Sequence, residues 1–257
     1  MRILAIGDVT SPAGLAHLKQ QLWRVRRQHD VDLCVVNAEN ASLITGISAE
    51  DADDLLQAGA DVLTGGNHTL RNKSVHGYLD ESRAMLRPIN FPSDVPGAGY
   101  TVIDVHGVRV LVINAMGNVH IDPVLDNPYP YIDRVLEREA GRYNVAVLDI
   151  HAEATGEKVA IGYAYDGRIQ VVFGTHTHVP TADLCILPQG TGYVTDVGMC
   201  GESGGVLGMD APSVVRRMRT RLPVKFTPAA GPVMADGVIF TVDVDTRRVS
   251  AVERIRF

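Results

Sequence analysis

The first third of the chain repeats one pattern: a short apolar run, a polar segment and then a stretch with helical periodicity. Residues 2–6, 33–36 and 61–64 form the apolar runs, and each is followed by a loop that contains Gly, Asn or Asp. Parallel strands need a crossover connection, usually a helix, so this alternation is typical of strand–loop–helix units. The pattern therefore predicts an α/β fold.

The helices between these strands carry signals of their own. Hydrophobic residues recur in the first helix at steps of three or four and predict one apolar face, formed by Leu15, Leu18, Leu22 and Val25. Ser48, with Asp51 three residues later, is typical of a capping box at the start of the second helix. We expect that helix to run to Gly59.

The middle of the chain departs from this pattern. Residues 85–100 are rich in Pro and Gly and are typical of a surface excursion. Residues 100–115 are typical of a β-hairpin that turns at His106 and Gly107. We interpret this hairpin as an insertion within the sheet order.

Apolar runs return in the second half and predict strands at 144–150 and 170–178, with a helix over 156–165 between them. A further helix is expected over 211–219. Four more strand candidates lie at residues 182–188, 192–198, 238–244 and 249–257. Strands this close in sequence favour an antiparallel or mixed arrangement. Because no repeat or linker divides the chain, we expect one domain over residues 1–257.

Composition and charge indicate where the protein acts and which large partners it does not bind. The net charge of -6 gives no general attraction for polyanions, so we expect no extended nucleic-acid face. Cys34, Cys185 and Cys200 are odd in number and lack CxxC spacing, which is typical of thiols in a reducing compartment. No stretch approaches the roughly 18 apolar residues of a membrane span. These features predict a cytoplasmic protein that does not enter membranes.

Side chains that can bind metal ions follow five of the predicted strands. Ligands of open α/β sheets lie outside the carboxyl ends of the strands, because loops from several strands converge there. Carboxylate, amide and imidazole groups together suit iron, manganese or zinc, whereas a structural zinc knuckle would need clustered thiolates. The sequence therefore predicts a catalytic metal site formed by Asp8, Glu39, Asn40, Asn67, His68, His151, His176 and His178.

Two details favour a pair of metal ions. Glu39 has two carboxylate oxygens, enough to bridge two cations about 3.5 to 4 Å apart. His176 and His178 are two residues apart, so in an extended segment their rings lie on the same side and can reach one site or two adjacent ones.

Each of these residues also has a structural interpretation. Asp8 could cap the following helix, and Asn40 and Asn67 could shape turns. His151 and His178, taken singly, could be hydrogen-bonded core histidines. Their common position at strand ends favours metal binding over these alternatives.

Several neighbouring residues stay ambiguous at this level. Asp149 and Glu153 flank His151 and could orient a metal-bound imidazole or form a structural ion pair. His120 could line a substrate pocket or cap a turn. The basic cluster at 214–221 is typical of a solvated helix face, although it could also contact phosphate.

The chain resembles the calcineurin-like metallophosphoesterases, and within them the bacterial branch of 2',3'-cyclic-nucleotide 2'-phosphodiesterases. The similarity runs almost from end to end. It is carried by GDV at 7–9, NAENAS at 37–42, DVLTGGNHT at 61–69, LRPINFP at 86–92, LDIHAEATGEK at 148–158, FGTHTHVPTAD at 173–183, TDVGM at 195–199 and LPVKF at 222–226. GNH and GTHTH mark the superfamily, whereas NAEN and DIHAEATGEK are more specific to the branch.

The resemblance implies a metallophosphoesterase-like sandwich of mixed β-sheets flanked by helices, and it implies a homo-oligomer. It also implies two metal ions bridged by Glu39. One would be held by Asp8, Glu39, Asn40 and His178, and the other by Glu39, Asn67, His151 and His176. Thr10 stands where the wider superfamily usually has a histidine, and Glu39 and Asn40 replace the usual bridging aspartate segment. Both differences fit the branch.

We expect a phosphodiesterase that hydrolyses cyclic nucleotides, with 2',3'-cyclic nucleotides preferred, through attack of a metal-bound hydroxide on phosphorus. Iron or manganese is the expected metal, with zinc as an alternative. The metals and Asn40 would neutralise charge on the phosphoryl oxygens, while His68 would protonate the leaving oxygen. The alternatives are a phosphomonoesterase or nucleotidase, and a non-catalytic regulatory protein that retains the metal site.

Overall fold

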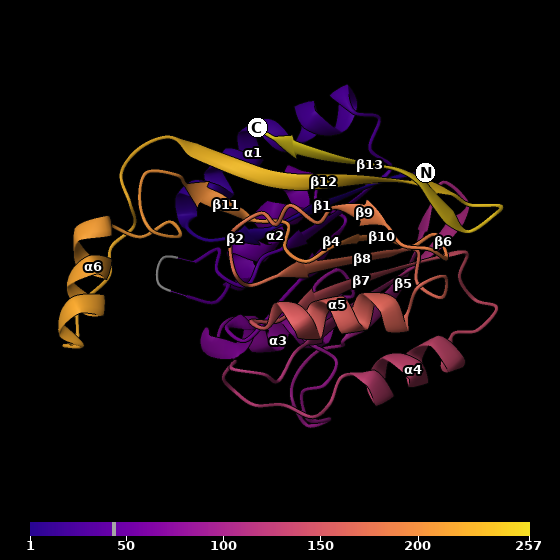
Figure 1. The fold of residues 1–257 in the computed structure, drawn as a ribbon, viewed down its shortest axis with the longest axis horizontal. Coiled ribbons are helices and arrows are strands. Elements are labelled where there is room, and N and C mark those ends of the chain that lie inside the picture. Colours follow the sequence, from indigo (N-terminus) through magenta and orange to yellow (C-terminus); the bar gives the residue numbers. More distant parts are fainter. Residues whose placement is uncertain (43–44) are drawn as a thin grey trace.

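The computed structural model describes residues 1–42 and 45–257, which form two β-sheets (Figure 1). The first sheet has seven strands in the order β2-β11-β12-β1-β3-β4, with β13 paired to β12. In it β1, β3 and β4 run parallel, whereas β12 is antiparallel to β1. The strands are β1 (Arg2–Ile6), β2 (Asp8–Val9), β3 (Leu33–Asn37), β4 (Val62–Thr64), β11 (Met199–Glu202), β12 (Val233–Asp243) and β13 (Arg248–Arg256).

The second sheet has six strands in the order β5-β6-β7-β8-β10-β9. Strands β6, β7, β8 and β10 are parallel, and the two edge strands are antiparallel to their neighbours. Their bounds are β5 (Tyr100–Val105), β6 (Val108–Met116), β7 (Val145–His151), β8 (Val171–Thr175), β9 (Cys185–Ile186) and β10 (Gly192–Val194). The carboxyl ends of β7 and β8 therefore lie at one edge of this sheet.

Three hydrophobic clusters hold these layers together. The central cluster joins the inner faces of both sheets, with Phe173 and Phe240 completely buried in it. One outer cluster joins the first sheet to α1, α2 and α3, and the other joins the second sheet to α4 and α5. The expected sandwich of mixed sheets flanked by helices is confirmed. The helices are α1 (Pro12–Gln28), α2 (Ala49–Ala58), η1 (Thr69–Arg71), α3 (Val75–Glu81), α4 (Tyr129–Arg138), α5 (Thr155–Ala164) and α6 (Ala211–Thr220).

Local sequence signals account for the helices beside the first sheet. Ser48 caps α2 in a capping box with Asp51, and the helix ends at Gly59, both as predicted. Gly59 has the left-handed conformation that is common at the end of a helix. Ser11 caps the start of α1, where its side chain accepts a hydrogen bond from the backbone N–H of Gly14. The predicted apolar face of α1 is buried.

The hairpin at residues 100–115 is not an insertion within the sheet order. It turns at His106 and Gly107, as predicted, but β6 pairs in parallel with β7 and so begins the second sheet. The interpretation was wrong because a hairpin pattern does not show which strand its second arm will pair with. Helices α3 and α4 and the short strands β2 and β11 had not been predicted.

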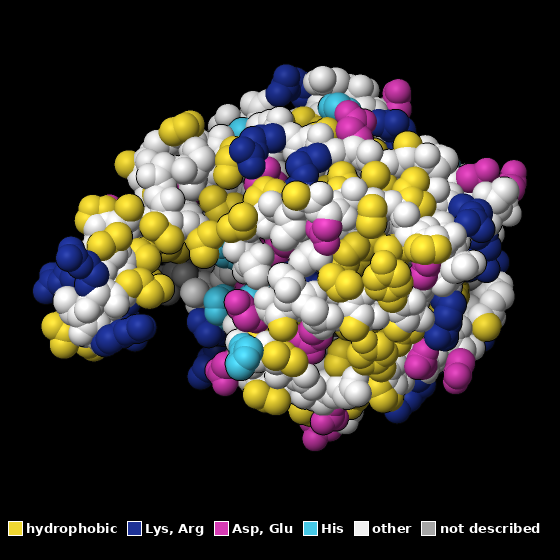
Figure 2. Space-filling view, viewed as in Figure 1, with side chains coloured by type: hydrophobic (Ala, Val, Ile, Leu, Met, Phe, Trp, Pro, Cys, Tyr) yellow, Lys and Arg dark blue, Asp and Glu magenta, His cyan; other side chains and the backbone are white. Residues whose placement is uncertain are grey.

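The segment around α6 extends away from both sheets (Figure 1). Seen as a surface, a hollow separates this helix from the body of the molecule (Figure 2). Throughout the described part of the chain, every helix is too short or too polar to span a bilayer.

Candidate metal centre

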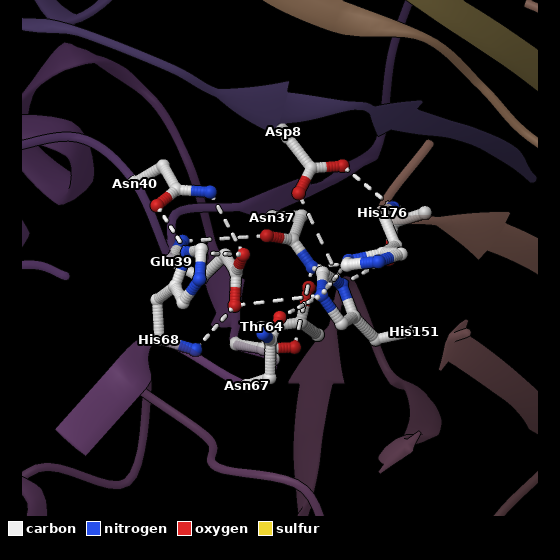
Figure 3. A network of polar contacts seen from close by, with 12 residues as sticks. Asp8, Asn37, Glu39, Asn40, Thr64, Asn67, His68, His151 and His176 are labelled. Atoms are coloured by element: carbon white, nitrogen blue, oxygen red, sulfur yellow. Dashed lines mark hydrogen bonds and ion pairs between the residues drawn. The ribbon is translucent and has the colours of Figure 1, made fainter. Parts of the chain in front are cut away.

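All eight residues predicted for the metal site lie together at the carboxyl ends of strands from both sheets. Figure 3 labels all of them except His178. Asp8 begins β2, directly after β1. Glu39 and Asn40 follow β3, and Asn67 and His68 follow β4. His151 ends β7, and His176 and His178 follow β8. The site therefore lies where the two sheets meet.

One group of donor atoms surrounds the imidazole of His151. Its Nε2 lies 3.4 Å from Glu39 Oε2, 3.1 Å from Asn67 Oδ1 and 3.1 Å from His176 Nδ1. Atoms of Glu39, His151 and His176 all lie within 4.8 Å of one another. Four side chains thus present donor atoms to one small volume.

Three further side chains, those of Asn40, Asp8 and His178, lie around this group. Asn40 Nδ2 donates to Glu39 Oε1 at 2.8 Å, and His178 Nε2 lies 3.6 Å from Asp8 Oδ1. Glu39 therefore directs one oxygen to the His151 group and the other to the Asn40 side.

Both carboxylates of the centre are completely buried. Burial alone would raise the pKa of Glu39, but the charges of His151 and His68 and their hydrogen bonds hold it well below its usual range. Burial opposes a charge on His151, yet the neighbouring carboxylates of Glu39, Asp8 and Asp149 raise its pKa to about 9. The carboxylates therefore favour positive charge beside them, which either a proton on His151 or a bound cation can supply.

The donor set fits a bound cation. Asp8 Oδ1 and His178 Nδ1 are buried and have no hydrogen-bond partner among the described residues, a costly arrangement for polar atoms. Burial and the nearby charge of His151 lower the pKa of His176 to about 4, so its ring is neutral, the form that binds metals. A Cβ at Gly66 would collide with His151 Nε2 and Glu39 Oε2. Only glycine leaves room for the cluster.

Asp149 and Glu153 support the histidines in different ways. Asp149 accepts from Thr175 Oγ1 at 2.8 Å, and that hydroxyl lies 2.9 Å from His151 Nδ1, so the carboxylate orients the ring through Thr175. Burial raises the pKa of Asp149 to about 6 despite its hydrogen bonds. Glu153 Oε2 lies 3.1 Å from His176 Nε2. Asn37, which donates to Asp149 at 3.0 Å, was missed because strand position alone gave it no distinguishing signal.

The segment that carries His176 and His178 is not extended, contrary to the expectation. Both residues have positive φ, 100° and 63°, in the left-handed region that is unfavourable for side chains with a Cβ. Strand β8 has already ended at Thr175, and the tight backbone turns His176 toward His151 and His178 toward Asp8. The two rings consequently reach different sides of the centre.

A buried ion pair holds this strained segment. Lys158 Nζ donates to Thr175 O at 2.7 Å and to Asp196 Oδ2 at 2.8 Å. Asp196 Oδ2 also accepts from Thr177 N at 3.0 Å and from Thr177 Oγ1 at 2.8 Å. Lys158 and Asp196 both lie in motifs that carry the family resemblance, but nothing in their spacing predicted that they would meet.

A cavity of about 440 Å³ opens beside the centre. Asn40, His68, His176 and His178 line one side of it, and residues around α6 line the other. The centre is therefore accessible to a small molecule.

Replacing Lys158 with Met should leave the Asp196 carboxylate buried without a counter-charge, so we expect a loss of about 3 to 5 kcal/mol in the free energy of unfolding. Urea denaturation measures this loss. Lys19→Met, which removes the exposed pair with Asp54, should cost less than about 1 kcal/mol. Equal small effects in both variants would contradict a supporting role for the buried pair.

Comparison with known proteins gives close matches over the whole chain. A 2',3'-cyclic-nucleotide 2'-phosphodiesterase from Bacillus subtilis (strain 168) is 41% identical over 255 residues, which cover 99% of this chain and 96% of that relative. A solved structure described as a novel phosphatase from Mycoplasma pneumoniae has a TM-score of 0.93 at 32% identity, covering 100% of this chain and 93% of that chain.

A 5'-nucleotidase precursor from Thermus thermophilus shares the fold alone, with a TM-score of 0.58 at 13% identity and coverage of 100% of this chain and 54% of that chain. The 41% identical relative from Bacillus subtilis confirms the resemblance inferred from the sequence motifs. A family model described as YmdB-like protein matches residues 4–255. This chain belongs to the family of YmdB-like proteins.

Proposed function

We propose that this protein is a dinuclear metal-dependent phosphodiesterase that hydrolyses cyclic nucleotides, with 2',3'-cyclic nucleotides preferred. The observation that carries the proposal is the position of Glu39, whose Oε2 faces His151 and whose Oε1 faces Asn40. The activity named for the 41% identical relative from Bacillus subtilis supports the same substrate class.

In this proposal Asp8, Asn40 and His178 hold one ion, Asn67, His151 and His176 hold the other, and Glu39 bridges them. Ions of this kind activate water and withdraw charge from phosphoryl oxygens when they are bound. Iron or manganese suits the mixed oxygen and nitrogen donors, and zinc is an alternative. The buried, unpartnered atoms of Asp8 and His178 support binding at the first position.

In this proposal His68 delivers a proton to the departing ribose oxygen. Its ring lines the cavity, and Nδ1 lies 2.7 Å from Asn40 Oδ1. With Nδ1 donating to that oxygen, Nε2 is the nitrogen that can hand its proton to a substrate. The backbone N–H of His68 donates to Glu39 Oε2 at 2.9 Å, which ties the position of the acid to the metal ligand.

A substrate panel tests the reaction class. Purified protein supplied with iron or manganese should hydrolyse 2',3'-cyclic nucleotides faster than 3',5'-cyclic nucleotides, and chelation should abolish turnover. Bis-para-nitrophenyl phosphate should be cleaved as a simple diester. A preference for para-nitrophenyl phosphate and AMP would instead identify a phosphomonoesterase, and no metal-dependent hydrolysis would favour a regulatory protein.

Glu39→Gln should lower the metal content, because the amide lacks the negative charge that attracts two cations. Elemental analysis should find about two ions per chain in the wild-type protein and fewer in the variant. Glu50→Gln, at an exposed position on α2, serves as the control and should keep both ions. Unchanged stoichiometry in Glu39→Gln would refute a bridging carboxylate.

His68→Ala should lose about 10²- to 10⁴-fold in turnover of 2',3'-cyclic nucleotides while it retains its metal. The loss should be smaller with bis-para-nitrophenyl phosphate, because para-nitrophenolate leaves readily without a proton. Steady-state kinetics and elemental analysis give both quantities. Loss of metal, or equal losses with both substrates, would overturn the role of His68 as the acid.

A further inference from the structure

Residues 203–232, here named the arm, leave the first sheet after β11 and return to it at β12 (Figure 1). The root of the arm is held by backbone hydrogen bonds between its two sides, including Ser203 N to Pro232 O at 3.0 Å and Ala229 N to Gly208 O at 2.9 Å. Farther out, Asp210 N donates to Thr227 O at 2.9 Å. The arm is therefore an ordered extension that carries α6 beside the metal centre.

The arm exposes a large share of the apolar surface. Of the twelve large hydrophobic side chains that are exposed in the described part of the chain, six lie on the arm: Val206, Leu207, Val215, Met218, Leu222 and Phe226. Met218 is 61% exposed and Phe226 is 44% exposed. Apolar surface gathered in this way typically marks a binding site.

Part of this surface faces the metal centre across the cavity of about 440 Å³. In the space-filling view, hydrophobic side chains of the arm border the hollow between α6 and the body (Figure 2). The cavity side of the arm is here named the apolar wall, and it is formed by Val206, Leu207, Met209, Val214, Met218 and Phe226. The exposed side chains of Val215 and Leu222 do not line this cavity.

We propose that the apolar wall binds the nucleobase of the substrate. The inference rests on the proposed function, since a phosphodiester at the metal centre would fix where the remainder of a nucleotide must lie. A nucleobase presents a flat face to its surroundings, and aromatic rings and thioethers pack well against such faces. Phe226 and Met218 supply both groups within the same cavity that His68 lines.

The size and chemistry of the cavity favour a mononucleotide over a longer chain. Its volume lies within the roughly 300 to 1,000 Å³ that small-molecule sites occupy. The arginines of α6, Arg216, Arg217 and Arg219, do not line it, so they offer no phosphate contacts there. Because the six side chains of the wall carry no nitrogen or oxygen atoms, the wall recognises a base by contact area and tolerates all four bases.

Kinetics with a matched pair of substrates test this subsite. One substrate is adenosine 2',3'-cyclic phosphate, and the other is methyl riboside 2',3'-cyclic phosphate, which lacks the base. Phe226→Ala and Met218→Ala should raise KM for the nucleotide by about 10-fold, within the range for loss of one base-stacking contact. The base-free substrate should be unaffected, and phosphorus NMR can follow both reactions.

Val215→Ala and Leu222→Ala are the matched controls, since they shorten exposed apolar side chains of the arm outside the cavity. They should leave both substrates unchanged. Equal effects of Phe226→Ala on the two substrates, or no effect on either, would overturn the assignment. Sedimentation of Phe226→Ala gives a further test. A smaller oligomer than that of the wild-type protein would also overturn the assignment, because it would show that a second copy of this chain covers the wall.

A binding measurement separates this proposal from the proposed reaction. Calorimetry with metal-loaded protein should show that adenosine 3'-monophosphate binds wild type more tightly than Met218→Ala, whereas methyl riboside 3-phosphate binds both equally. The wild-type protein could fail to hydrolyse both cyclic substrates and still bind adenosine 3'-monophosphate more tightly than Met218→Ala does. In that case only the proposed reaction is refuted. If the difference is absent, the base subsite is refuted whether or not the protein is active.

Discussion

The centre of this protein depends on two carboxylates, Asp8 and Glu39, that are completely removed from water. A buried negative charge is stable only when positive charge and hydrogen-bond donors surround it. The backbone N–H groups of His68 and His176 donate hydrogen bonds to these carboxylates, and the imidazole of His151 lies 3.4 Å from Glu39. These contacts come from three different strand ends, so the site exists only when the strands are correctly assembled.

The two sheets are joined at this edge by polar contacts as well as by the apolar layer. Asn37 of β3 donates to Asp149 of β7 at 3.0 Å, and Asn114 of β6 donates to Gly65 O, beyond β4, at 3.0 Å. Such buried polar contacts have a definite geometry, whereas apolar packing tolerates small shifts. They fix the register of one sheet against the other, and with it the separation of Glu39 and His151.

Much of the fold, and the position of the eight candidate site residues at strand ends, could be predicted from the sequence because the signals are local. The apolar runs before Asp8 and Glu39 identify strand ends, and Ser48 with Asp51 identifies a helix start. The ion pair of Lys158 with Asp196 spans 38 residues, and the register of β6 with β7 is also set by distant partners. Propensity and periodicity describe neighbours in sequence and carry no information on such contacts.

The arm begins and ends on β11 and β12, which are antiparallel neighbours in the first sheet. An excursion between two adjacent strands can be lengthened, shortened or exchanged without changing the pairing of the strands that flank it. Strand β11 also pairs with Asp8 and Val9. A change in the length or sequence of the arm would therefore leave the strands that carry the candidate metal centre in place, so that the surface facing the centre can change independently of the centre itself.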